Sequence, residues 1–535
     1  MNTGILNVAQ HLRSRAKTNP QAVAVIDPKD RITITFKQLE EKSNGAAHKL
    51  SKSKIQKNTK TLIMLKPSVE LLVVVFALFK IGAVPIVIDP GMGVINFLKC
   101  VRSSRPEALV GSFLAYLMSL IFVSCFRKTN RRFIVFKDKF LNSISPQESF
   151  ELAATQPDDL AAILFTSGST GAPKGVCYTH AIFNAQLSSI RDNYGIQPNE
   201  VDLPMLPVFA LFNPALGITT IIPDMNPSRP ATVDPKKIVD AILKYEVSNS
   251  FGSPVLWRKI ADYCESYQIT LPSLKRVLMA GCSVPTDLLK RYEKILPNGV
   301  VHTPYGATEA LPISSISNKE LFEKNLHLKI GQGTCIGKPL PNCEIKIIKI
   351  TEELLLKFCP SLELKQGEIG EIIVRGSVVT KEYLNLPHAN FNSKIYDGST
   401  IWHRMGDLGF IDADGYIWYC GRKIERVETS FGTLFTDCCE SIINQHPSVY
   451  RSALIGIKKN NEIIPAIVIE PYQNAWPKSK KAKECLLSEV KELAKKYYIT
   501  AKIEDFFLHK AFPVDPRHNA KIHRLTLAKY FTKNR

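Results

Sequence analysis

The chain has 535 residues, more than one ordinary hydrophobic core holds, so we expect at least two domains. Its hydrophobic fraction of 45% and charged fraction of 22% are those of a folded globular protein and exclude a disordered chain. The formal net charge of +20 is explained either by a lysine-rich surface alone or by binding of an anionic substrate, an acidic membrane lipid or an acidic partner. The sequence has no basic motif interleaved with aromatic residues, the pattern that would indicate nucleic-acid binding.

Twelve cysteines are scattered without CxxC spacing, and only Cys438 and Cys439 are neighbours. Because no signal peptide precedes them, they predict reduced, buried thiols of a cytoplasmic protein. The most membrane-like run, residues 113–126, is too short to span a bilayer and is closed by Arg127. We expect a buried helix there, with peripheral membrane contact as the alternative.

The first part of the chain alternates strands and helices. Apolar periodicity predicts helices at 5–12, 36–49 and 69–79, and strands at 23–26, 33–36, 61–65, 83–88, 108–110 and 133–135. Strand 61–65, helix 69–79 and strand 83–88 form a βαβ unit, which requires a parallel sheet. The sequence therefore predicts an α/β fold.

Residues 165–175, FTSGSTGAPKG, follow the apolar run 160–164 and precede a helix-like segment from Ala181. The stretch combines small, hydroxyl-bearing and basic residues: Thr166, Ser167, Gly168, Ser169, Thr170, Gly171, Lys174 and Gly175. Glycines allow close backbone approach, successive amides form an anion nest, and a lysine adds charge. A polyphosphate cradle is favoured over a Gly/Ser-rich surface turn. Gly175 after Lys174 excludes the GxxxxGK[ST] loop, which needs a hydroxyl there for Mg²⁺.

Downstream segments carry further polar residues. Residues 201–214 are apolar, aromatic and broken by proline, too irregular for a helix, and form either core packing or one wall of an acyl pocket. Residues 249–254 and 277–283 are typical of strand ends that deliver small residues into a cleft. Residues 303–310, TPYGATEA, offer an aromatic face, a glycine, a hydroxyl and a carboxylate in a loop.

The last third of the chain adds a carboxylate and two cations. Asp407 lies in a GD turn, suited to accept two hydroxyl hydrogen bonds or simply to face solvent. Residues 412–416 predict a hairpin turn. Arg422 follows in the segment 420–423, and Lys521 follows a Pro-Arg-His-Asn loop near the end. We expect helices at 436–444 and 486–496, strands at 453–457 and 463–469, and a solvated basic turn at 477–483.

These motifs, in this order, resemble the superfamily of adenylate-forming enzymes: acyl-CoA synthetases, fatty acyl-AMP ligases, peptide-synthetase adenylation domains and luciferases. The resemblance implies that ATP and Mg²⁺ are bound. It assigns the phosphates to residues 166–174, with Thr166 and Glu309 on Mg²⁺ as catalytic residues. It assigns nucleotide contacts to Gly281, Cys282, Ser283, Tyr305, Gly306, Thr308, Asp407 and Arg422. In relatives a lysine contacts the acid and the α-phosphate; Lys521 aligns with it, and Ala520 replaces the usual glycine.

The resemblance also implies an architecture. We expect a large N-terminal adenylation domain, residues 1–420, built of stacked, mostly parallel sheets with helices and a small β-rich part. A small, mobile α+β domain, residues 421–535, would carry Lys521. Relatives reach a glycine ten positions after the first one of this hinge, whereas this chain takes one residue more before Gly432. Because that loop helps admit the thiol in acyl-CoA synthetases, the difference puts thioester formation in doubt.

Finer motifs resemble the olefin β-lactone synthetases of bacterial hydrocarbon biosynthesis. They lie at 211–214, 222–227, 303–309, 421–429, 512–515 and 517–521. The resemblance implies activation of a 2-alkyl-3-hydroxy fatty acid and closure of a β-lactone without CoA, with a thiolase-like condensing enzyme and a short-chain reductase as pathway partners. His180 and His518 are candidate bases for the hydroxyl proton. The alternatives are a long-chain fatty acid–CoA ligase, a fatty acyl-AMP ligase, or a non-catalytic acyl or nucleotide sensor.

Overall fold

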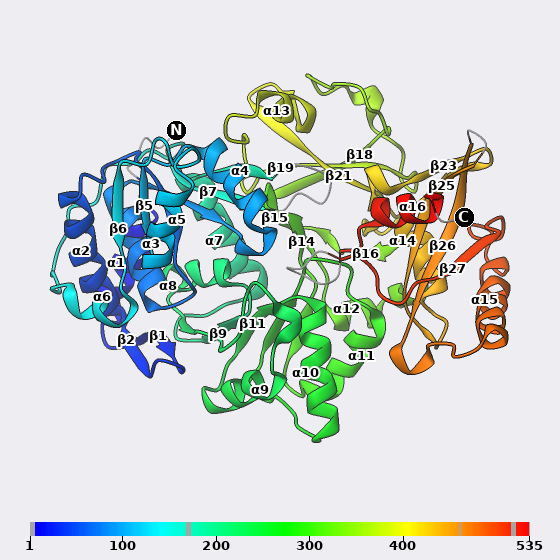
Figure 1. Cartoon of the computed structure of the whole chain (residues 1–535), viewed down its shortest axis with the longest axis horizontal. Coiled ribbons are helices and arrows are strands. Elements are labelled where there is room, and N and C mark those ends of the chain that lie inside the picture. Colours follow the sequence, from blue (N-terminus) through cyan, green and yellow to red (C-terminus); the bar gives the residue numbers. More distant parts are fainter. Residues whose placement is uncertain (1–5, 167–172, 460–461, 515–520, 534–535) are drawn as a thin grey trace.

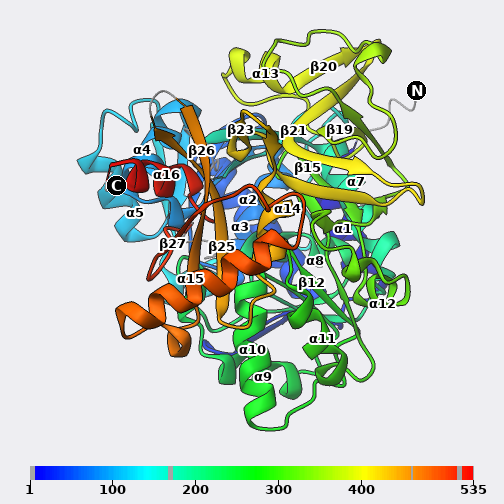
Figure 2. The same cartoon turned by 90° about the vertical axis from the view of Figure 1, so that its right-hand side faces the viewer.

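The computed structural model describes residues 6–166, 173–459, 462–514 and 521–533. Figure 1 shows the first part of the chain, blue to green, built around two sheets, and the orange and red C-terminal elements grouped at the opposite end. Between them lies a yellow, β-rich part. The turned view in Figure 2 shows the same grouping of the C-terminal elements. The predicted α/β fold class, with mostly parallel sheets and a small α+β C-terminal part, is confirmed.

One sheet carries the stretch that leads into the predicted phosphate loop. Its strands lie in the order β6-β5-β3-β4-β7-β8, parallel except for the last pair. The strands are β3 (Lys60–Met64), β4 (Val84–Ile88), β5 (Ala108–Gly111), β6 (Arg131–Ile134), β7 (Leu160–Thr166) and β8 (Lys174–Thr179). The predicted βαβ unit is present as β3, a helix and β4. The helix cap Ser68 accepts a hydrogen bond from Leu71 N at 3.4 Å.

The second sheet has the order β13-β12-β11-β9-β10-β1-β2, with only β1 and β2 antiparallel. Its strands are β1 (Val23–Asp27), β2 (Ile32–Thr35), β9 (Val201–Pro204), β10 (Thr219–Ile221), β11 (Asn249–Gly252), β12 (Arg276–Met279) and β13 (Val300–His302). Parallel strands place their carboxyl ends at one edge, so the residues after β9, β11 and β12 open toward the same side.

Helices cover both sheets. They are α1 (Ala9–Thr18), α2 (Phe36–Lys52), α3 (Val69–Ile81), α4 (Val94–Ser104), α5 (Phe113–Ile121), α6 (Lys137–Ser143), α7 (His180–Tyr194), α8 (Asn213–Leu216), α9 (Pro235–Lys244), α10 (Pro254–Ser266), α11 (Thr286–Ile295) and α12 (Asn318–Glu323). Helix α13 (Pro387–Ser393) lies with the β-rich part (Figure 1). Helix α3 is apolar on all sides and nearly wholly buried, as a helix without a polar face must be. It shares one core with α1, α2 and α7.

Several local predictions were wrong or incomplete. The predicted helix from Ala181 is present as α7, but strand β8, which was not predicted, precedes it, because Val, Cys, Tyr and Thr at 176–179 favour a strand paired with β7. The helix expected at 5–12 runs instead over Ala9–Thr18. The stretch 201–214, expected to be too irregular for a helix, holds β9, a 3₁₀ turn at Pro207–Leu211 and the start of the four-residue α8, where Pro214 occupies the first turn and loses no hydrogen bond. Cys359 and Cys485 are exposed rather than buried.

The β-rich part consists of an antiparallel sheet and a smaller one beside it. The larger sheet holds β16 (Thr334–Cys335), β18 (Cys343–Ile348), β19 (Gly370–Gly376), β20 (Lys394–Asp397), β21 (Thr400–Ile411) and β22 (Ile417–Arg422). The smaller holds β14 (Tyr305–Ala307), β15 (Ala310–Ser315) and β17 (Lys338–Pro339). The predicted turn at 412–416 joins β21 to β22, and Asp412 Oδ1 accepts hydrogen bonds from Asp414 N and Tyr416 N at 3.0 and 2.9 Å.

After β22 the chain forms the C-terminal part. Its elements are the hairpin β23 (Val427–Thr429) and β24 (Gly432–Leu434), α14 (Thr436–Ile443), β25 (Val449–Lys459), β26 (Glu462–Pro471), α15 (Lys480–Lys495), β27 (Asp505–Leu508) and α16 (Arg524–Lys533). Two clusters of buried side chains, one on each face of the β25-β26-β27 sheet, are made by residues after 426. This part therefore has its own core, and the domain boundary expected between residues 420 and 421 stays a prediction.

Gly421 permits the passage from β22 into the C-terminal part. Its φ is +132°, and a Cβ there would lie 2.1 Å from Thr436 Oγ1 on α14. Gly432 has a similar φ of +124° but open space around it. We predict that Gly421→Ala destabilises the packing of α14 on β22 by about 2 kcal/mol more than Gly432→Ala, because only the first adds overlap to the backbone strain. Urea unfolding of both variants measures the difference; equal midpoints would contradict the argument.

Candidate active site

Asp407 is the centre of the predicted nucleotide site. It lies on β21, is buried, and pairs across the ladder with Arg422 on β22. Tyr305 Oη donates to Asp407 Oδ2 at 2.5 Å, and Arg422 Nη1 donates to Asp407 Oδ1 at 2.6 Å. The Asp407 charge holds the pKa of Arg422 above its usual range, while burial, followed by the same carboxylate, raises the pKa of Tyr305. The structure thus brings together three of the residues expected to contact the nucleotide.

Tyr305 lies on a short strand rather than in the expected loop. Strands β14 and β15 form a hairpin, in which Ala307 pairs with Ala310. Gly306 is needed there because a Cβ would lie 2.5 Å from Ala310 O. The turn of this hairpin holds Thr308, whose carbonyl oxygen accepts a hydrogen bond from Tyr178 Oη at 2.5 Å. The hairpin therefore holds the aromatic face and the following Glu309 at fixed positions.

Glu309 faces cations and a phenol. Tyr383 Oη donates to Glu309 Oε1 at 2.7 Å, and Thr380 N donates to the Glu309 carbonyl at 2.8 Å. Lys174 Nζ lies 4.8 Å from the centroid of the Tyr383 ring. Burial, followed by the Glu309 charge, raises the pKa of Tyr383, so its phenol keeps its proton and donates. Glu309, which is half-buried, and Lys174 from β8 thus contact the same tyrosine. Both residues are expected at the phosphates.

A second lysine lies beneath this cluster. Lys394, the first residue of β20, is fully buried; its Nζ donates to the Thr380 carbonyl and lies 5.9 Å from the Tyr383 ring centroid. Burial lowers its pKa to about 7, against the raising effect of Glu309. Because Thr380 in turn holds the Glu309 backbone, Lys394 supports the position of Glu309. Nothing in the sequence around a lone lysine after helix α13 marks it as buried.

The phosphate loop itself lies outside the described residues from 167 to 172. Predictions for Ser167, Gly168, Ser169, Thr170 and Gly171 therefore stay predictions, as does the hydroxyl role of Thr166. The two ends are defined: Thr166 pairs with Lys174, and Phe165 pairs with Gly175. A Cβ on Gly175 would lie 2.7 Å from the Phe165 ring, so glycine allows this close pairing.

The segment 281–283 meets the C-terminal part. Gly281 has a φ of +104° just after β12, and Cys282 is half-buried. Ser283 Oγ donates to Asp437 Oδ1 on α14 at 3.1 Å, and Thr334 Oγ1 donates to Asp437 Oδ2 at 2.5 Å. Burial raises the pKa of Asp437 to about 6, against the lowering effect of these hydrogen bonds. Ser283 was expected to contact the nucleotide, but here it contacts Asp437 and so connects the two parts of the chain. Asp437 was not predicted from the sequence.

Lys521 is exposed and stands just before α16. Ile522 beside it belongs to the core of the C-terminal part and pairs with Val514. Arg524 connects the start of α16 to the segment after β22 and to α14, because its Nη1 donates to Glu425 at 2.9 Å and its Nη2 donates to Glu440 at 2.6 Å. The role expected of Lys521 at the acid and the α-phosphate is still a prediction.

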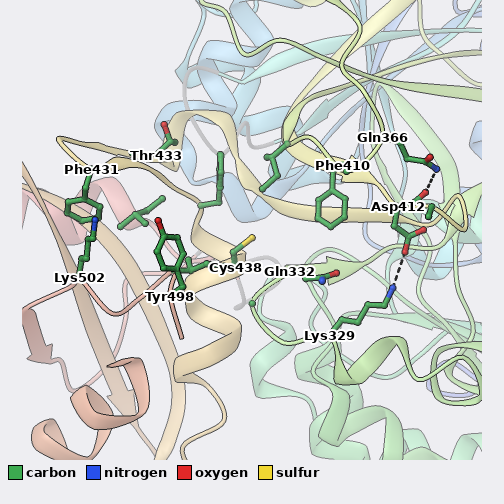
Figure 3. A pocket seen from close by; sticks show the side chains of 18 of the residues that line it. Lys329, Gln332, Gln366, Phe410, Asp412, Phe431, Thr433, Cys438, Tyr498 and Lys502 are labelled. Carbon is green, nitrogen blue, oxygen red and sulfur yellow. Dashed lines mark hydrogen bonds and ion pairs between the residues drawn. The ribbon is translucent and has the colours of Figure 1, made fainter. Parts of the chain in front are cut away.

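A cavity of about 710 Å³ opens between the two parts of the chain. Figure 3 shows Phe431, Tyr498 and Lys502 of the C-terminal part on one side, and Gln332, Phe410 and Asp412 on the other. It does not coincide with the predicted site, since neither Asp407 nor Glu309 lines it. A second cavity, of about 20 Å³, has an apolar lining that includes Leu72, Met205, Ala210 and Met225.

The donor set around Glu309 fits magnesium and a triphosphate. Among the described residues, no group of three or more His, Cys, Asp or Glu side chains could hold a metal ion by itself. Mg²⁺ is usually held by one or two carboxylates together with substrate phosphates, so a single carboxylate suffices. Glu309 would supply that carboxylate, and Lys174 would supply a charge for the phosphate oxygens.

A family model described as AMP-binding enzyme matches residues 12–384. The chain is 37% identical to the olefin beta-lactone synthetase of Xanthomonas campestris pv. campestris, over 100% of this chain and 99% of that protein. It is also 37% identical to the olefin beta-lactone synthetase of Stenotrophomonas maltophilia, over 98% and 97% of the two chains. The O-succinylbenzoate coenzyme A synthetase of Bacillus subtilis, solved in complex with ATP and magnesium ion, shares the fold with a TM-score of 0.77 and 23% identity, covering 97% of this chain and 98% of that one.

The chain therefore belongs to the AMP-binding family of adenylate-forming enzymes. It is an AMP-forming ligase or synthetase, as the order of the motifs predicted. Enzymes of this family use ATP with Mg²⁺ and act on a small-molecule acid.

The Tyr383 hydrogen bond generates a test of the Glu309 cluster. We predict that Tyr383→Phe slows ATP–pyrophosphate exchange by roughly tenfold, because a hydrogen bond to a charged group contributes about 1.5–3 kcal/mol. It should also raise the Mg²⁺ concentration for half-maximal exchange, since Glu309 loses a group that orients it. Tyr396→Phe, at an exposed tyrosine of β20, is the matched control. An unchanged Mg²⁺ dependence would show that Glu309 does not meet the metal.

The Asp437 contact predicts a pH dependence. Burial raises its pKa from 3.8 to about 6, so the packing of α14 is most stable below about pH 4 and loses up to about 3 kcal/mol as pH rises through 6, because the buried carboxylate then ionises. Hydrogen exchange of α14 should therefore quicken between pH 5 and 7, after correction for the intrinsic rate. Asp437→Asn removes the titration and should abolish this trend. The same trend in both proteins would refute the assignment.

Proposed function

We propose that the chain converts a long-chain 2-alkyl-3-hydroxy fatty acid into its acyl-adenylate and then closes it to a β-lactone. The observation that carries this proposal is the 37% identity, over nearly the whole length, to two proteins named olefin beta-lactone synthetase. The apolar character of residues 201–214 agrees with a fatty acid. Phe209 stacks on Phe251 at 3.9 Å, and Phe212 stacks on Phe183 at 4.6 Å.

In the first half-reaction, a carboxylate oxygen of the acid would attack the α-phosphorus of ATP. A new P–O bond forms while the bond to pyrophosphate breaks. Asp407 would accept hydrogen bonds from the ribose hydroxyls, Tyr305 would face the adenine, and Lys174 and Lys521 would offset negative charge at the phosphates and the carboxylate. Mg²⁺, when bound through Glu309 and Thr166, would supply Lewis-acid stabilisation of the triphosphate.

In the second half-reaction, the 3-hydroxyl oxygen would attack the acyl carbon. The C–O bond to AMP breaks, the hydroxyl proton is released, and a four-membered lactone closes. A hydroxyl held on the same molecule has a high effective concentration, so no second acceptor is needed. His180 is a poor base for that proton: burial lowers its pKa to about 4, and its Nδ1 accepts a hydrogen bond from Val8 N at 3.3 Å. His518 lies outside the described residues.

The hairpin after the hinge favours this product over a thioester. It holds one residue more than in acyl-CoA synthetases, and Phe431 at its tip lies under Lys502, whose Nζ is 5.2 Å from the ring centroid. An acyl-CoA ligase or acyl-AMP ligase is the second candidate, because the family includes both. The two are separated by the requirement for CoA and for the 3-hydroxyl group.

The test is incubation of the purified chain with ATP, Mg²⁺ and a 2-alkyl-3-hydroxy fatty acid without CoA. We expect β-lactone, AMP and pyrophosphate in equal amounts by mass spectrometry. Accumulation of acyl-AMP that yields thioester on addition of CoA would assign the second candidate instead. Nucleotide binding without any turnover would indicate a sensor.

The same assay tests the terminal lysine. We predict that Lys521→Ala lowers adenylate formation by roughly 10²–10³-fold, the loss typical of removing one group that stabilises transition-state charge. Lys529→Ala, at an exposed lysine further along α16, should retain full activity. If the two variants behave alike, Lys521 does not act at the reacting centre.

A further inference from the structure

Helix α5 has its apolar residues facing outward. Its buried positions are the small Ala115 and Ser119, whereas Leu114 and Ile121 are 74% and 73% exposed. Phe113, Leu117 and Leu120 on the helix, and Val123 after it, are exposed as well. A surface helix normally buries its leucines and exposes small or polar residues. The prediction of a buried helix at 113–126 was therefore wrong, and the apolar stripe is available to something outside the chain.

Helix α4 extends this surface. Strands β4, β5 and β6 succeed one another in one direction across the sheet, with β3 between the first two, so right-handed connections place α4 and α5 on the same face. Phe97 and Leu98 of α4 share an apolar cluster with Met118 of α5, and Figures 1 and 2 both show the helices as neighbours. At the start of α4, Val94 and Ile95 are also exposed. We call these exposed residues of α4 and α5, together with Val123, the α4–α5 surface.

The charged residues of the segment that forms the α4–α5 surface are almost all basic. Exposed basic residues lie on α4 and after both helices: Lys99 and Arg102 on α4, Arg105 after it, and Arg127 and Lys128 after α5. Between residues 91 and 132 the sequence has one acidic residue, Glu107, which lies 3.8 Å from Arg131. Basic residues beside exposed aliphatic and aromatic side chains are the combination that binds anionic lipid: the apolar groups enter the acyl boundary and the cations meet the headgroups.

We propose that the α4–α5 surface docks on an anionic lipid surface, with Leu114 and Ile121 inserted below the headgroups and Arg127 and Lys128 in contact with them. The chain would lie on the bilayer rather than cross it, because no helix within the described ranges is long and apolar enough to span one. A protein partner fits less well, since interface cores are depleted of lysine and the cations here follow directly on the apolar stripe.

Docking in this way would bring the candidate site close to lipid. Helices α4 and α5 start at the carboxyl ends of β4 and β5, the edge of the sheet at which β7 leads into the phosphate loop. The turn before α4 also approaches the segment that lines the apolar cavity, because a Cβ on Gly91 would lie 3.9 Å from Ser228 O. Delivery of an apolar acid from the lipid rests on the proposed function; the docking itself does not.

Sedimentation of the full chain with sucrose-loaded vesicles tests the docking without any activity measurement. We expect binding to vesicles of phosphatidylcholine mixed with phosphatidylglycerol, and weaker binding to phosphatidylcholine alone or at high salt. Leu114→Ser/Ile121→Ser should weaken binding by roughly tenfold or more, and Arg127→Glu/Lys128→Glu by a similar factor. All four side chains are exposed, so circular dichroism should report an unchanged fold.

Matched controls carry the same changes elsewhere. Leu354→Ser/Leu356→Ser alters two exposed leucines of the β-rich part, and Lys480→Glu/Lys481→Glu alters two exposed lysines at the start of α15. Both should bind vesicles like the unchanged chain. The proposal fails if the unchanged chain does not bind, or if the controls weaken binding as much as the α4–α5 variants. It also fails if light scattering shows a dimer that only the α4–α5 variants disrupt, because the surface would then be covered by a second copy.

Discussion

The carboxylate of Asp407 connects the parts of this molecule. It is buried on β21, and both of its oxygens accept hydrogen bonds, one from Tyr305 on β14 and one from Arg422 at the end of β22. A buried charge is tolerated only when it is paired and hydrogen-bonded, so these three strands must keep their relative positions. Since the chain enters its C-terminal part directly after Arg422, the group expected to hold the ribose also fixes the point at which the predicted hinge would begin.

A second set of buried charges lies around Glu309. Tyr383, Thr380 and Lys394 support its side chain and backbone, and Lys174 reaches the same tyrosine from β8. Lys174 can balance the carboxylate, while burial lowers the pKa of Lys394 to about 7, so this amine is only partly protonated at neutral pH. A bound triphosphate would favour the charged form of Lys394. The low effective dielectric of a buried site makes this preference stronger than it would be on the surface.

The sequence was a good guide wherever periodicity and chemistry agreed. The unit β3-α3-β4, the strand β7 and the hairpin β21–β22 were all predicted, because continuous apolar runs and Asp-Gly turns have few other solutions. Strand β8 was missed because it contains Gly175 and because a helix was expected soon after the loop, so its short run of strand-favouring residues was not recognised. Helix α5 was predicted, but an apolar run does not say which of its faces meets the core. Lys394 and Asp437 depend on contacts between distant segments, for which one sequence has no signal.

The presence of strand β8 changes the role expected of Lys174, one of the residues predicted to bind phosphate. Lys174 is not a loop residue: it is the first residue of a strand, in register with Thr166, and its ammonium group rests on the Tyr383 ring. Its backbone entropy is therefore lost when the sheet folds, not when the nucleotide arrives. If Lys174 binds phosphate as predicted, the energy of that attraction would be available for affinity rather than for ordering the backbone of a flexible loop.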